Sequence, residues 1–160
     1  FVEALYRASQ AGVEVDLTIR GICALRPGLQ GRSERIKVRS FLGRFLEHSR
    51  IYYFHNAGEE EYWIGSADLM HRNLDRRIET LIKIENAEHK NYLSNLLELY
   101  RDTDTKRWEL EPSGDWKRIH GDSTFDIQEK LKAVAKKRNI ILQGTWAYYG
   151  FESIIWARKP

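Results

Sequence analysis

The sequence predicts an α/β domain in which helices flank one mixed β-sheet. Strict alternation of apolar and polar residues over 13–20 indicates a half-buried strand, and the aromatic and β-branched run over 49–56 indicates another. A stripe of apolar residues at helical spacing over 86–102 indicates a long amphipathic helix. Strands mixed with packed helices are typical of α/β and α+β domains, and 160 residues, 42% of them hydrophobic, suit a single domain.

The N-terminal third is predicted to contain two helices and two strands. Residues before Gly12 place apolar side chains on one side of a helix, and the glycine is a suitable C-terminal cap. The alternating strand that follows ends in Arg20, and proline and glycine then predict a loop. In chain order we expect a helix at 1–11, a strand at 13–20, a loop at 26–33, a strand at 35–40 and two helical turns at 41–48.

The rest of the chain is predicted to add hairpins and two more helices. A short polar turn between two aromatic strands favours a hairpin, and the segment PSGD favours a second hairpin further on. Ser123 or Thr124 can cap the last helix. We expect strands at 49–56, 62–67 and 76–85, a helix at 86–102, two strands within 106–120 and a helix at 122–138, followed by a β-prone tail.

Composition limits the partners and the cellular setting. The net charge is only +3, so bulk charge does not favour a nucleic-acid binder. No apolar run approaches the ~18 residues of a membrane span, and no signal peptide is recognisable. The single cysteine, Cys23, excludes an internal disulfide framework, so the reducing cytoplasm is the simplest location. The chain begins at Phe1 inside a predicted helix and its only methionine is Met70, so we expect a piece of a longer protein.

The first group of candidate functional residues surrounds His48. A histidine can be a nucleophile or a general acid near neutral pH, and a strand would point it the same way as Arg50. The stretch GSADLMHRNLDRR adds a Gly-Ser and an asparagine that can donate to an oxyanion, and arginines suited to phosphate. Such groups suit phosphoryl transfer. The candidate phosphate-binding residues are Arg50, Ser66, Asn73, Arg76 and Arg77.

Each of these candidates also has a structural interpretation. A single histidine near a strand is often structural or solvated, and the arginine pair at 76–77 can form a solvated face paired with the acidic run at 59–61. Arg20 lies at a strand end, where ligands gather in α/β sheets, so it is a candidate phosphate contact. The alternative for Arg20 is an edge salt bridge to Asp16 or Glu14.

Known metal and nucleotide motifs are missing from the sequence. The other histidines and Cys23 show no metal-ligand spacing. Neither a Walker A motif nor a glycine-rich dinucleotide loop occurs. Any nucleotide is therefore held in another way.

Four blocks of the sequence closely resemble the C-terminal part of the long form of bacterial polyphosphate kinase. In chain order they are VDLTIRGICALRPG, VRSFLGRFLEHSRIYYF, GEEEYWIGSADLMHRNLDRRIE and WELEPSGDWKR. The resemblance covers about residues 1–136 and implies a phospholipase D-like fold. Half-sites of that fold place a histidine and a lysine or arginine near a Gly-Ser and an asparagine, and His48, Arg50, Ser66 and Asn73 look like one such half-site.

The resemblance also implies an activity. The family transfers the terminal phosphate of ATP reversibly to inorganic polyphosphate through a phosphohistidine, with Mg²⁺. Arg20 matches an ATP-contacting arginine, and His48 matches an active-site histidine that contacts the nucleotide and assists transfer. The phosphorylated histidine and the arginines associated with magnesium would lie outside this chain, so no metal ligand is expected here.

Further expectations concern the partners and the division of the chain. The resemblance implies ATP or ADP, polyphosphate and upstream domains of the same protein as partners, in a cytoplasmic homo-oligomer without nucleic acid. We assign 1–136 to the second phospholipase D-like domain and 137–160 to a tail of unassigned role, which can add a strand pair. The chain alone is predicted not to turn over ATP.

Two other functions fit the same residues. A homodimeric phospholipase D-like nuclease or phosphodiesterase would bring two copies of His48 together and would cleave diesters without metal. A non-catalytic remnant would bind polyphosphate in a strongly salt-dependent manner without turnover.

Overall fold

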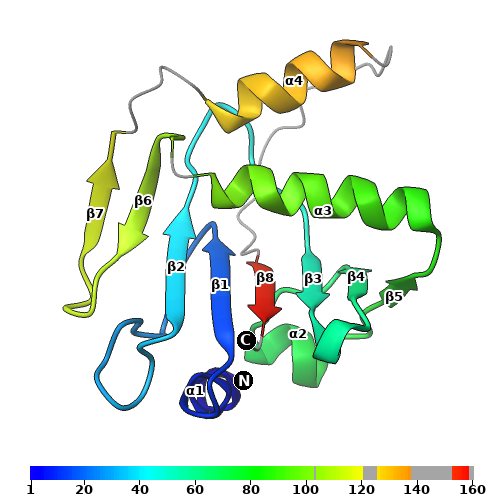
Figure 1. The fold of residues 1–160 in the computed structure, drawn as a ribbon. Coiled ribbons are helices and arrows are strands. Elements are labelled where there is room, and N and C mark those ends of the chain that lie inside the picture. The colour runs from blue at the N-terminus through cyan, green and yellow to red at the C-terminus, as the bar shows by residue number, and fades with distance from the viewer. Residues whose placement is uncertain (103, 121–125, 138–152, 159–160) are drawn as a thin grey trace.

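The computed structural model describes residues 1–102, 104–120, 126–137 and 153–158, which form a mixed eight-stranded sheet with helices on both faces (Figure 1). The helices are α1 (Val2–Gln10), α2 (His71–Arg76), α3 (Ala87–Arg101) and α4 (Ile127–Lys137), with a short 3₁₀ turn, η1 (Asn56–Gly58). The strands are β1 (Glu14–Ile19), β2 (Ile36–Ser40), β3 (Ile51–Phe54), β4 (Glu61–Gly65), β5 (Leu81–Ile84), β6 (Arg107–Leu110), β7 (Trp116–Ile119) and β8 (Ser153–Arg158).

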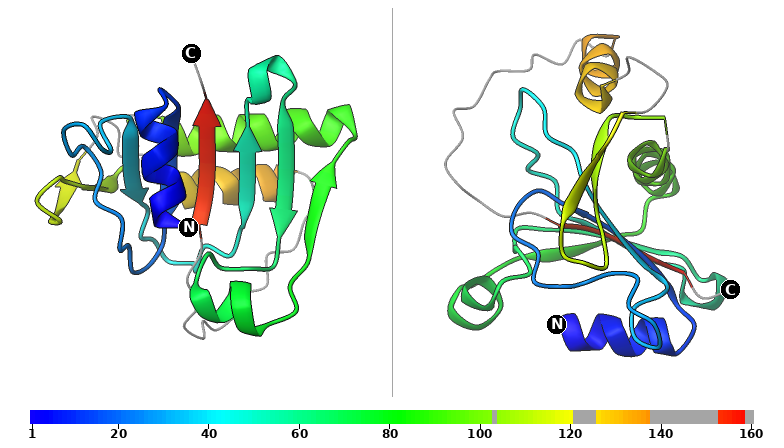
Figure 2. Two further views of the ribbon diagram at one scale, coloured as in Figure 1. Left: turned by 90° about the horizontal axis from the view of Figure 1, so that it is seen from below. Right: turned by 90° about the vertical axis from the view of Figure 1, so that its left-hand side faces the viewer.

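The strand order is β5-β4-β3-β8-β1-β2-β6-β7. β1 and β2 run parallel, whereas β8 is antiparallel to β1 and parallel to β3. The other neighbouring strands are antiparallel. α1 and α2 lie against one face of the sheet, and α3 and α4 lie against the other (Figure 2).

Each face of the sheet buries its own apolar core, as the alternation of strand side chains requires. Under α1, Val15 and Leu17 of β1 pack with Tyr6. Under α3, Leu93 and Leu97 pack against the other face. The remaining buried members of the first core are Leu25, Ile36, Val38, Tyr52 and Leu110, and those of the second are Phe41, Ile51, Tyr53, Tyr62, Tyr100 and Ile127.

The parallel pairing of β1 and β2 determines where the candidate residues meet. The C-terminal ends of both strands lie at the same edge of the sheet, at the top of Figure 1. Arg20 directly follows β1, and the segment 41–50 leads from the end of β2 to the start of β3. This edge therefore brings Arg20 close to the segment that carries His48.

The two helical turns predicted over 41–48 are wrong, because this segment is an extended loop. A buried side chain of α4, Gln128, replaces the helical backbone bonds: its Oε1 accepts from the Phe45 N–H at 2.8 Å and its Nε2 donates to the Phe45 carbonyl at 2.6 Å. A Cβ at Gly43 would clash with the same amide, so a larger residue there would require the Gln128 side chain to shift. Tertiary contacts thus override the local apolar pattern.

The strand predicted over 76–85 is shorter than expected, and a helix precedes it. Residues 71–76 form α2, and β5 begins only at Leu81, which pairs with Gly65 at the end of β4. Two hydrogen bonds close this end of the ladder: Ser66 N–H donates to the Thr80 carbonyl at 3.0 Å, and Thr80 N–H donates to Ser66 Oγ at 2.9 Å. β5 is an edge strand and three of its four residues are exposed.

The structure confirms the other elements that fall within the described residues, with ends shifted by a few positions. The cap proposed at Ser123 or Thr124 lies outside them. In the tail, β8 lies between β1 and β3 near the middle of the sheet, whereas 138–152 is not described, so the division of the chain after residue 136 stays a prediction. Among the described helices, none is both long and apolar enough to cross a membrane.

Candidate active site

Arg20 is held against the backbone beside His48. Its Nη1 donates to the carbonyl oxygen of Glu47 at 2.6 Å. The structure does not contain the alternative salt bridge from Arg20 to Asp16 or Glu14. Asp16 pairs with Arg39 and Arg101 instead, and Glu14 pairs with Arg35. The strand end thus places the Arg20 guanidinium next to the loop that carries the imidazole.

Glu47 anchors this loop from the α3 side of the sheet. Its Oε2 accepts a hydrogen bond from the Tyr100 hydroxyl at 2.7 Å. Its Oε1 accepts one from Gln128 Nε2 at 3.2 Å. Tyr100 is only 1% exposed, so the residue next to His48 is attached to the core.

Arg50 connects His48 to a buried carboxylate. Its Nε and Nη2 donate to Asp68 Oδ1 at 3.1 and 2.9 Å, and Asp68 is only 2% exposed. Its Nη1 donates to His48 Nδ1 at 3.0 Å. Arg72 lies 3.6 Å from the other oxygen of Asp68. Asp68 therefore fixes Arg50, and Arg50 orients the imidazole.

This arrangement determines the protonation of His48. An arginine can only donate, so Nδ1 accepts and a neutral imidazole carries its proton on Nε2. Partial burial and the positive charges of Arg50 and Arg20 lower the pKa of His48 below its usual value, and Asp68 opposes the shift. The neutral imidazole is therefore favoured at neutral pH, with Nε2–H as a hydrogen-bond donor.

Ser66 and Asn73 meet at a third carboxylate, Glu79. Ser66 Oγ donates to Glu79 Oε2 at 2.6 Å, and Asn73 Nδ2 donates to Glu79 Oε1 at 2.8 Å. These two hydrogen bonds, together with the charges of Arg77 and Arg50, lower the pKa of Glu79 despite some desolvation. The fold brings these two donors together, and both donate to a carboxylate of the chain itself.

Arg76 and Arg77 lie at the end of α2 and are both exposed. Arg77 Nε lies 3.6 Å from Glu79 Oε1. The predicted pairing of this arginine pair with 59–61 is not the arrangement found: Glu61 binds Lys83 and Glu60 accepts from Tyr53. Arg77 therefore borders the cluster of Ser66, Asn73 and Glu79.

The residues around His48 do not fit a divalent metal. Among the described residues, no group of three or more histidine, cysteine, aspartate or glutamate side chains is placed to hold an ion. The nearest buried carboxylate, Asp68, is already bound by Arg50. Two guanidinium groups and an imidazole N–H suit an anion instead.

Sequence reasoning missed three residues that build this site. Glu79 and Gln128 are not among the sequence-based candidates, and Asp68 lies inside the stretch GSADLMHRNLDRR without an assigned role. The signal for Asp68 was its place two residues after Ser66 in a polar stretch. No local signal identified Gln128, which is 80 residues from His48 in the sequence and acts only through the folded chain.

Comparisons with known proteins agree with the residues that carry the resemblance. The family model described as Polyphosphate kinase C-terminal domain 2 matches residues 1–129. A polyphosphate kinase of Streptomyces coelicolor is 54% identical over 141 residues, which are 86% of this chain and 19% of that protein. One of Mycobacterium avium is 58% identical over 115 residues, which are 72% of this chain and 16% of that protein.

A solved structure supports the fold. The crystal structure of polyphosphate kinase from Porphyromonas gingivalis superposes with a TM-score of 0.76 at 38% identity, and covers 86% of this chain and 21% of that one. This confirms the predicted phospholipase D-like fold class. The chain spans about a fifth of the length of these relatives.

Proposed function

Because the chain belongs to the polyphosphate kinase family, we propose that it supplies the C-terminal half of an active site that transfers the terminal phosphate of ATP reversibly to polyphosphate. The relatives are about five times longer, so the other half belongs to the rest of the full-length protein. The partners are therefore ATP or ADP, inorganic polyphosphate and the upstream domains.

The observation that carries the proposal is the pair of guanidinium groups around His48. Arg20 is fixed on the Glu47 carbonyl and Arg50 on Asp68, so both are preorganised beside the imidazole. Arg20 and His48 bind the phosphates of ATP, and Arg50 orients the imidazole. Preorganised donors stabilise charge on a transferring phosphoryl group without reorganising during the reaction.

His48 acts as a hydrogen-bond donor and proton-transfer group in this scheme. Its Nε2–H donates to a phosphoryl oxygen, whereas the nucleophilic nitrogen belongs to a histidine elsewhere in the full-length protein. That histidine takes the γ-phosphoryl group: its N–P bond forms as the bond to the bridging oxygen breaks, and ADP leaves with that oxygen. The terminal oxygen of polyphosphate then takes the phosphoryl group from the histidine, which restores the free imidazole.

A secondary role in phosphate binding is assigned to four further residues: Ser66, Asn73, Arg76 and Arg77. Ser66 and Asn73 donate to Glu79 in this structure, so a phosphate would have to compete with that carboxylate for the two donors. Magnesium would neutralise phosphate charge in the full-length enzyme, and no residue of this chain is assigned to it. The proposal also includes that the full-length protein is cytoplasmic and forms a homo-oligomer.

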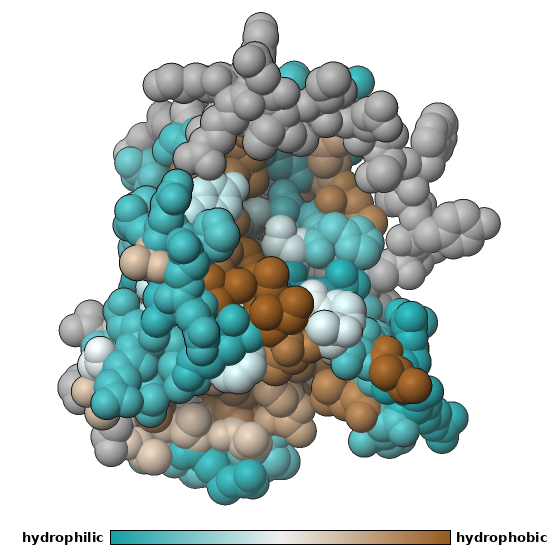
Figure 3. Space-filling view, turned by 90° about the vertical axis from the view of Figure 1, so that its right-hand side faces the viewer, coloured by the Kyte–Doolittle hydropathy of each residue, from teal (hydrophilic) through white to brown (hydrophobic). Residues whose placement is uncertain are grey.

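An apolar rim beside the half-site supports contact with the rest of the protein. Ile78, Leu81 and Ile82 are more than half exposed, and Leu74 of α2 is 50% exposed. Apolar side chains are visible among hydrophilic ones on this side of the molecule (Figure 3). Exposed apolar patches and open edge strands commonly mark interaction surfaces.

Replacement of His48 in the full-length protein tests the proposal. Loss of a well-placed proton-transfer group typically costs ~10²–10⁴ in rate, so His48→Ala should lower polyphosphate synthesis by that order. His89→Ala is the matched control, because His89 is an exposed histidine on α3. Equal activities of the two variants would contradict the proposed role of His48.

A further inference from the structure

Glu47 joins the two residues that are proposed to contact ATP. Its carbonyl oxygen accepts the hydrogen bond from Arg20 Nη1 at 2.6 Å, and His48 follows it directly in the chain. The separation between the guanidinium of Arg20 and the imidazole of His48 therefore depends on where the backbone of Glu47 lies. Whatever fixes that backbone also fixes the geometry of the pair.

The carboxylate of Glu47 binds two buried side chains, one from α3 and one from α4. The Tyr100 hydroxyl donates to its Oε2 at 2.7 Å, and Gln128 Nε2 donates to its Oε1 at 3.2 Å. Tyr100 and Gln128 are both buried. Hydrogen bonds accepted by a carboxylate are stronger than those between neutral groups, so the two helices hold the side chain of Glu47 in place.

The packing of Tyr100 keeps this contact in one position. The ring of Phe41 packs edge-on against the ring of Tyr100, with the two ring centroids 5.5 Å apart, and both residues belong to the buried core under α3. Phe41 begins the loop that carries His48, and Glu47 lies near the end of that loop. The loop is therefore attached to the same tyrosine at both ends, so its position follows that of α3.

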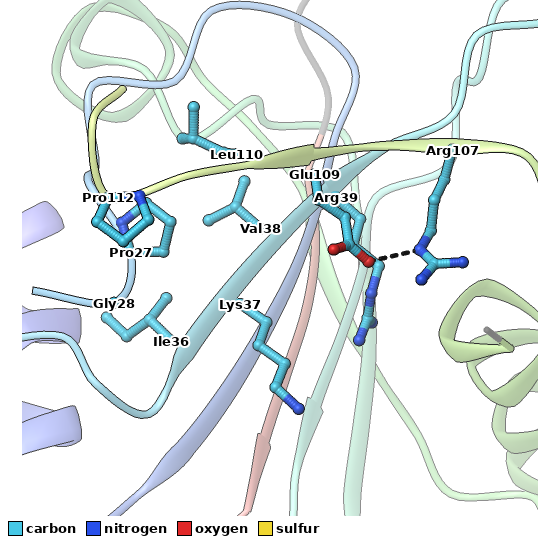
Figure 4. Close-up of a pocket in the computed structure, with 10 residues that line it drawn as sticks. All are labelled: Pro27, Gly28, Ile36, Lys37, Val38, Arg39, Arg107, Glu109, Leu110 and Pro112. Atoms are coloured by element: carbon cyan, nitrogen blue, oxygen red, sulfur yellow. Dashed lines mark hydrogen bonds and ion pairs between the residues drawn. The ribbon is translucent and has the colours of Figure 1, made fainter. Parts of the chain in front are cut away.

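The polar side of β1, which ends in Arg20, faces the same helix. Figure 4 shows Arg39 of β2 pointing away from Val38, as strand alternation requires. Arg39 Nη1 lies 2.7 Å from Asp16 Oδ1 of β1, and Arg101 Nε of α3 lies 3.2 Å from Asp16 Oδ2. Asp16 and Arg20 are four residues apart, so an extended chain points them the same way. Arg20 therefore approaches Glu47 from the α3 side of the sheet.

The contacts of Glu47 argue against direct participation in phosphate binding. A carboxylate repels a phosphate because both are negatively charged, and both oxygens of this carboxylate accept hydrogen bonds from buried side chains of the chain itself. Only its backbone carbonyl meets a residue of the site, the guanidinium of Arg20. Any effect of Glu47 on the reaction must therefore pass through Arg20 and His48.

We propose that Glu47 is a positioning residue of the phosphotransfer reaction, through which α3 and α4 hold Arg20 and His48 at a fixed separation. The inference rests on the function proposed above and adds to it a residue that does not touch the substrate. Preorganised donors are effective because they do not move during the reaction. A displacement of such groups by about 1 Å can cost ~10²-fold in rate.

The first test compares Glu47→Ala with Glu88→Ala in the full-length protein. Release of Arg20 and His48 should raise the KM for ATP about tenfold, whereas Glu88 is exposed in the first turn of α3 and its loss should leave the KM unchanged. If Glu47 acts through Arg20, Glu47→Ala/Arg20→Ala should cost less in kcat/KM than the product of the two single costs. Equal KM values for the two glutamate variants, or a double variant that reaches the full product, would overturn the proposal.

Tyr100→Phe replaces Glu47→Ala if that variant does not fold. It removes only the hydroxyl that donates to Glu47 and keeps the ring that packs against Phe41. The KM for ATP should rise about threefold, as expected for the loss of one hydrogen bond that acts indirectly. Tyr92→Phe is the matched control, because Tyr92 is a largely exposed tyrosine of the same helix. Equal KM values for the two tyrosine variants would reject the positioning role.

Titration of His48 in the 160-residue chain separates this inference from the proposed function, because it requires neither ATP nor catalysis. Partial burial and the charges of Arg50 and Arg20 lower the pKa of His48, so loosening the loop with Tyr100→Phe should raise that pKa toward its ordinary value. Histidine proton resonances followed against pH measure the change. An unchanged pKa would contradict the positioning role. A raised pKa, combined with an unchanged KM for ATP in Arg20→Ala and His48→Ala, would support the anchor and reject the function assigned to those two residues.

Discussion

At the residue scale, hydrogen bonds link His48 to Arg50 and Arg50 to Asp68. This network explains how a histidine can assist phosphoryl transfer without being the nucleophile. The cation on Nδ1 keeps the proton of the neutral ring on Nε2. A second proton would remove the acceptor that Arg50 requires. The ring is therefore suited to donate to an oxyanion and unsuited to attack phosphorus through Nε2.

The pKa of His48 provides a direct check of this arrangement. Arg50→Gln/Asp68→Asn removes both charges, and the lowering by Arg50 exceeds the raising by Asp68. The pKa of His48 should therefore rise toward the ordinary value of about 6.5. Histidine proton resonances followed against pH measure it. An unchanged midpoint would show that Arg50 does not control the imidazole.

The direction of the shift also predicts a pH dependence. Because the pKa of His48 is lowered in the folded chain, the unfolded chain binds a proton first as pH falls. Neutral His48 therefore contributes fully to the free energy of unfolding above about pH 6.5, the pKa of the unfolded chain. This contribution, and the contact with Arg50, are lost as pH falls through the lower pKa of the folded chain. In the unmodified chain the His48–Arg50 contact should persist at neutral pH.

The sequence predicts candidate site residues, but it does not predict the partners that hold them. Arg20, His48 and Arg50 follow from strand ends and side-chain direction, which are local properties. The bond from Arg20 to the Glu47 carbonyl and the binding of Ser66 and Asn73 by Glu79 depend on how segments meet. Residue types alone therefore suggested free phosphate donors where the folded chain has internal hydrogen bonds.

At the element scale, the loop over 41–50 takes its shape from α4. Gln128 satisfies the Phe45 backbone and reaches Glu47, whose neighbour is His48. An element distant in sequence thus positions the candidate active-site histidine. Strands with strict alternation are predictable from the sequence because one face must be buried. The apolar residues of this loop have helical spacing, and only the folded chain shows that Gln128 holds the loop instead.

Removal of the Gln128 amide tests that dependence. Gln128→Ala leaves partly buried backbone groups of Phe45 without their partner, which should cost about 1–3 kcal/mol in the free energy of unfolding. Gln10→Ala is the control, because Gln10 makes one exposed hydrogen bond to the Gly31 carbonyl. Urea denaturation of both variants measures the difference. Equal stabilities would mean that the amide does not hold the loop.

At the scale of the whole molecule, the proposed function makes the candidate groups one half of a site. Arg20, His48 and Arg50 gather at one edge of the sheet, and the Ser66, Asn73 and Glu79 cluster lies close to the exposed rim of Leu74, Ile78, Leu81 and Ile82. The matched relatives extend far beyond this chain. Under the proposed function, a complete reaction centre would also use residues from the rest of the full-length protein.

Phosphotransfer by the isolated chain is the most direct test of this conclusion. The 160-residue chain is incubated with ATP, Mg²⁺ and polyphosphate, beside the full-length protein, and ADP and polyphosphate length are followed. The full-length protein should lengthen polyphosphate, whereas the isolated chain should produce no ADP above background. Sustained ADP formation with polyphosphate growth by the isolated chain would contradict the half-site.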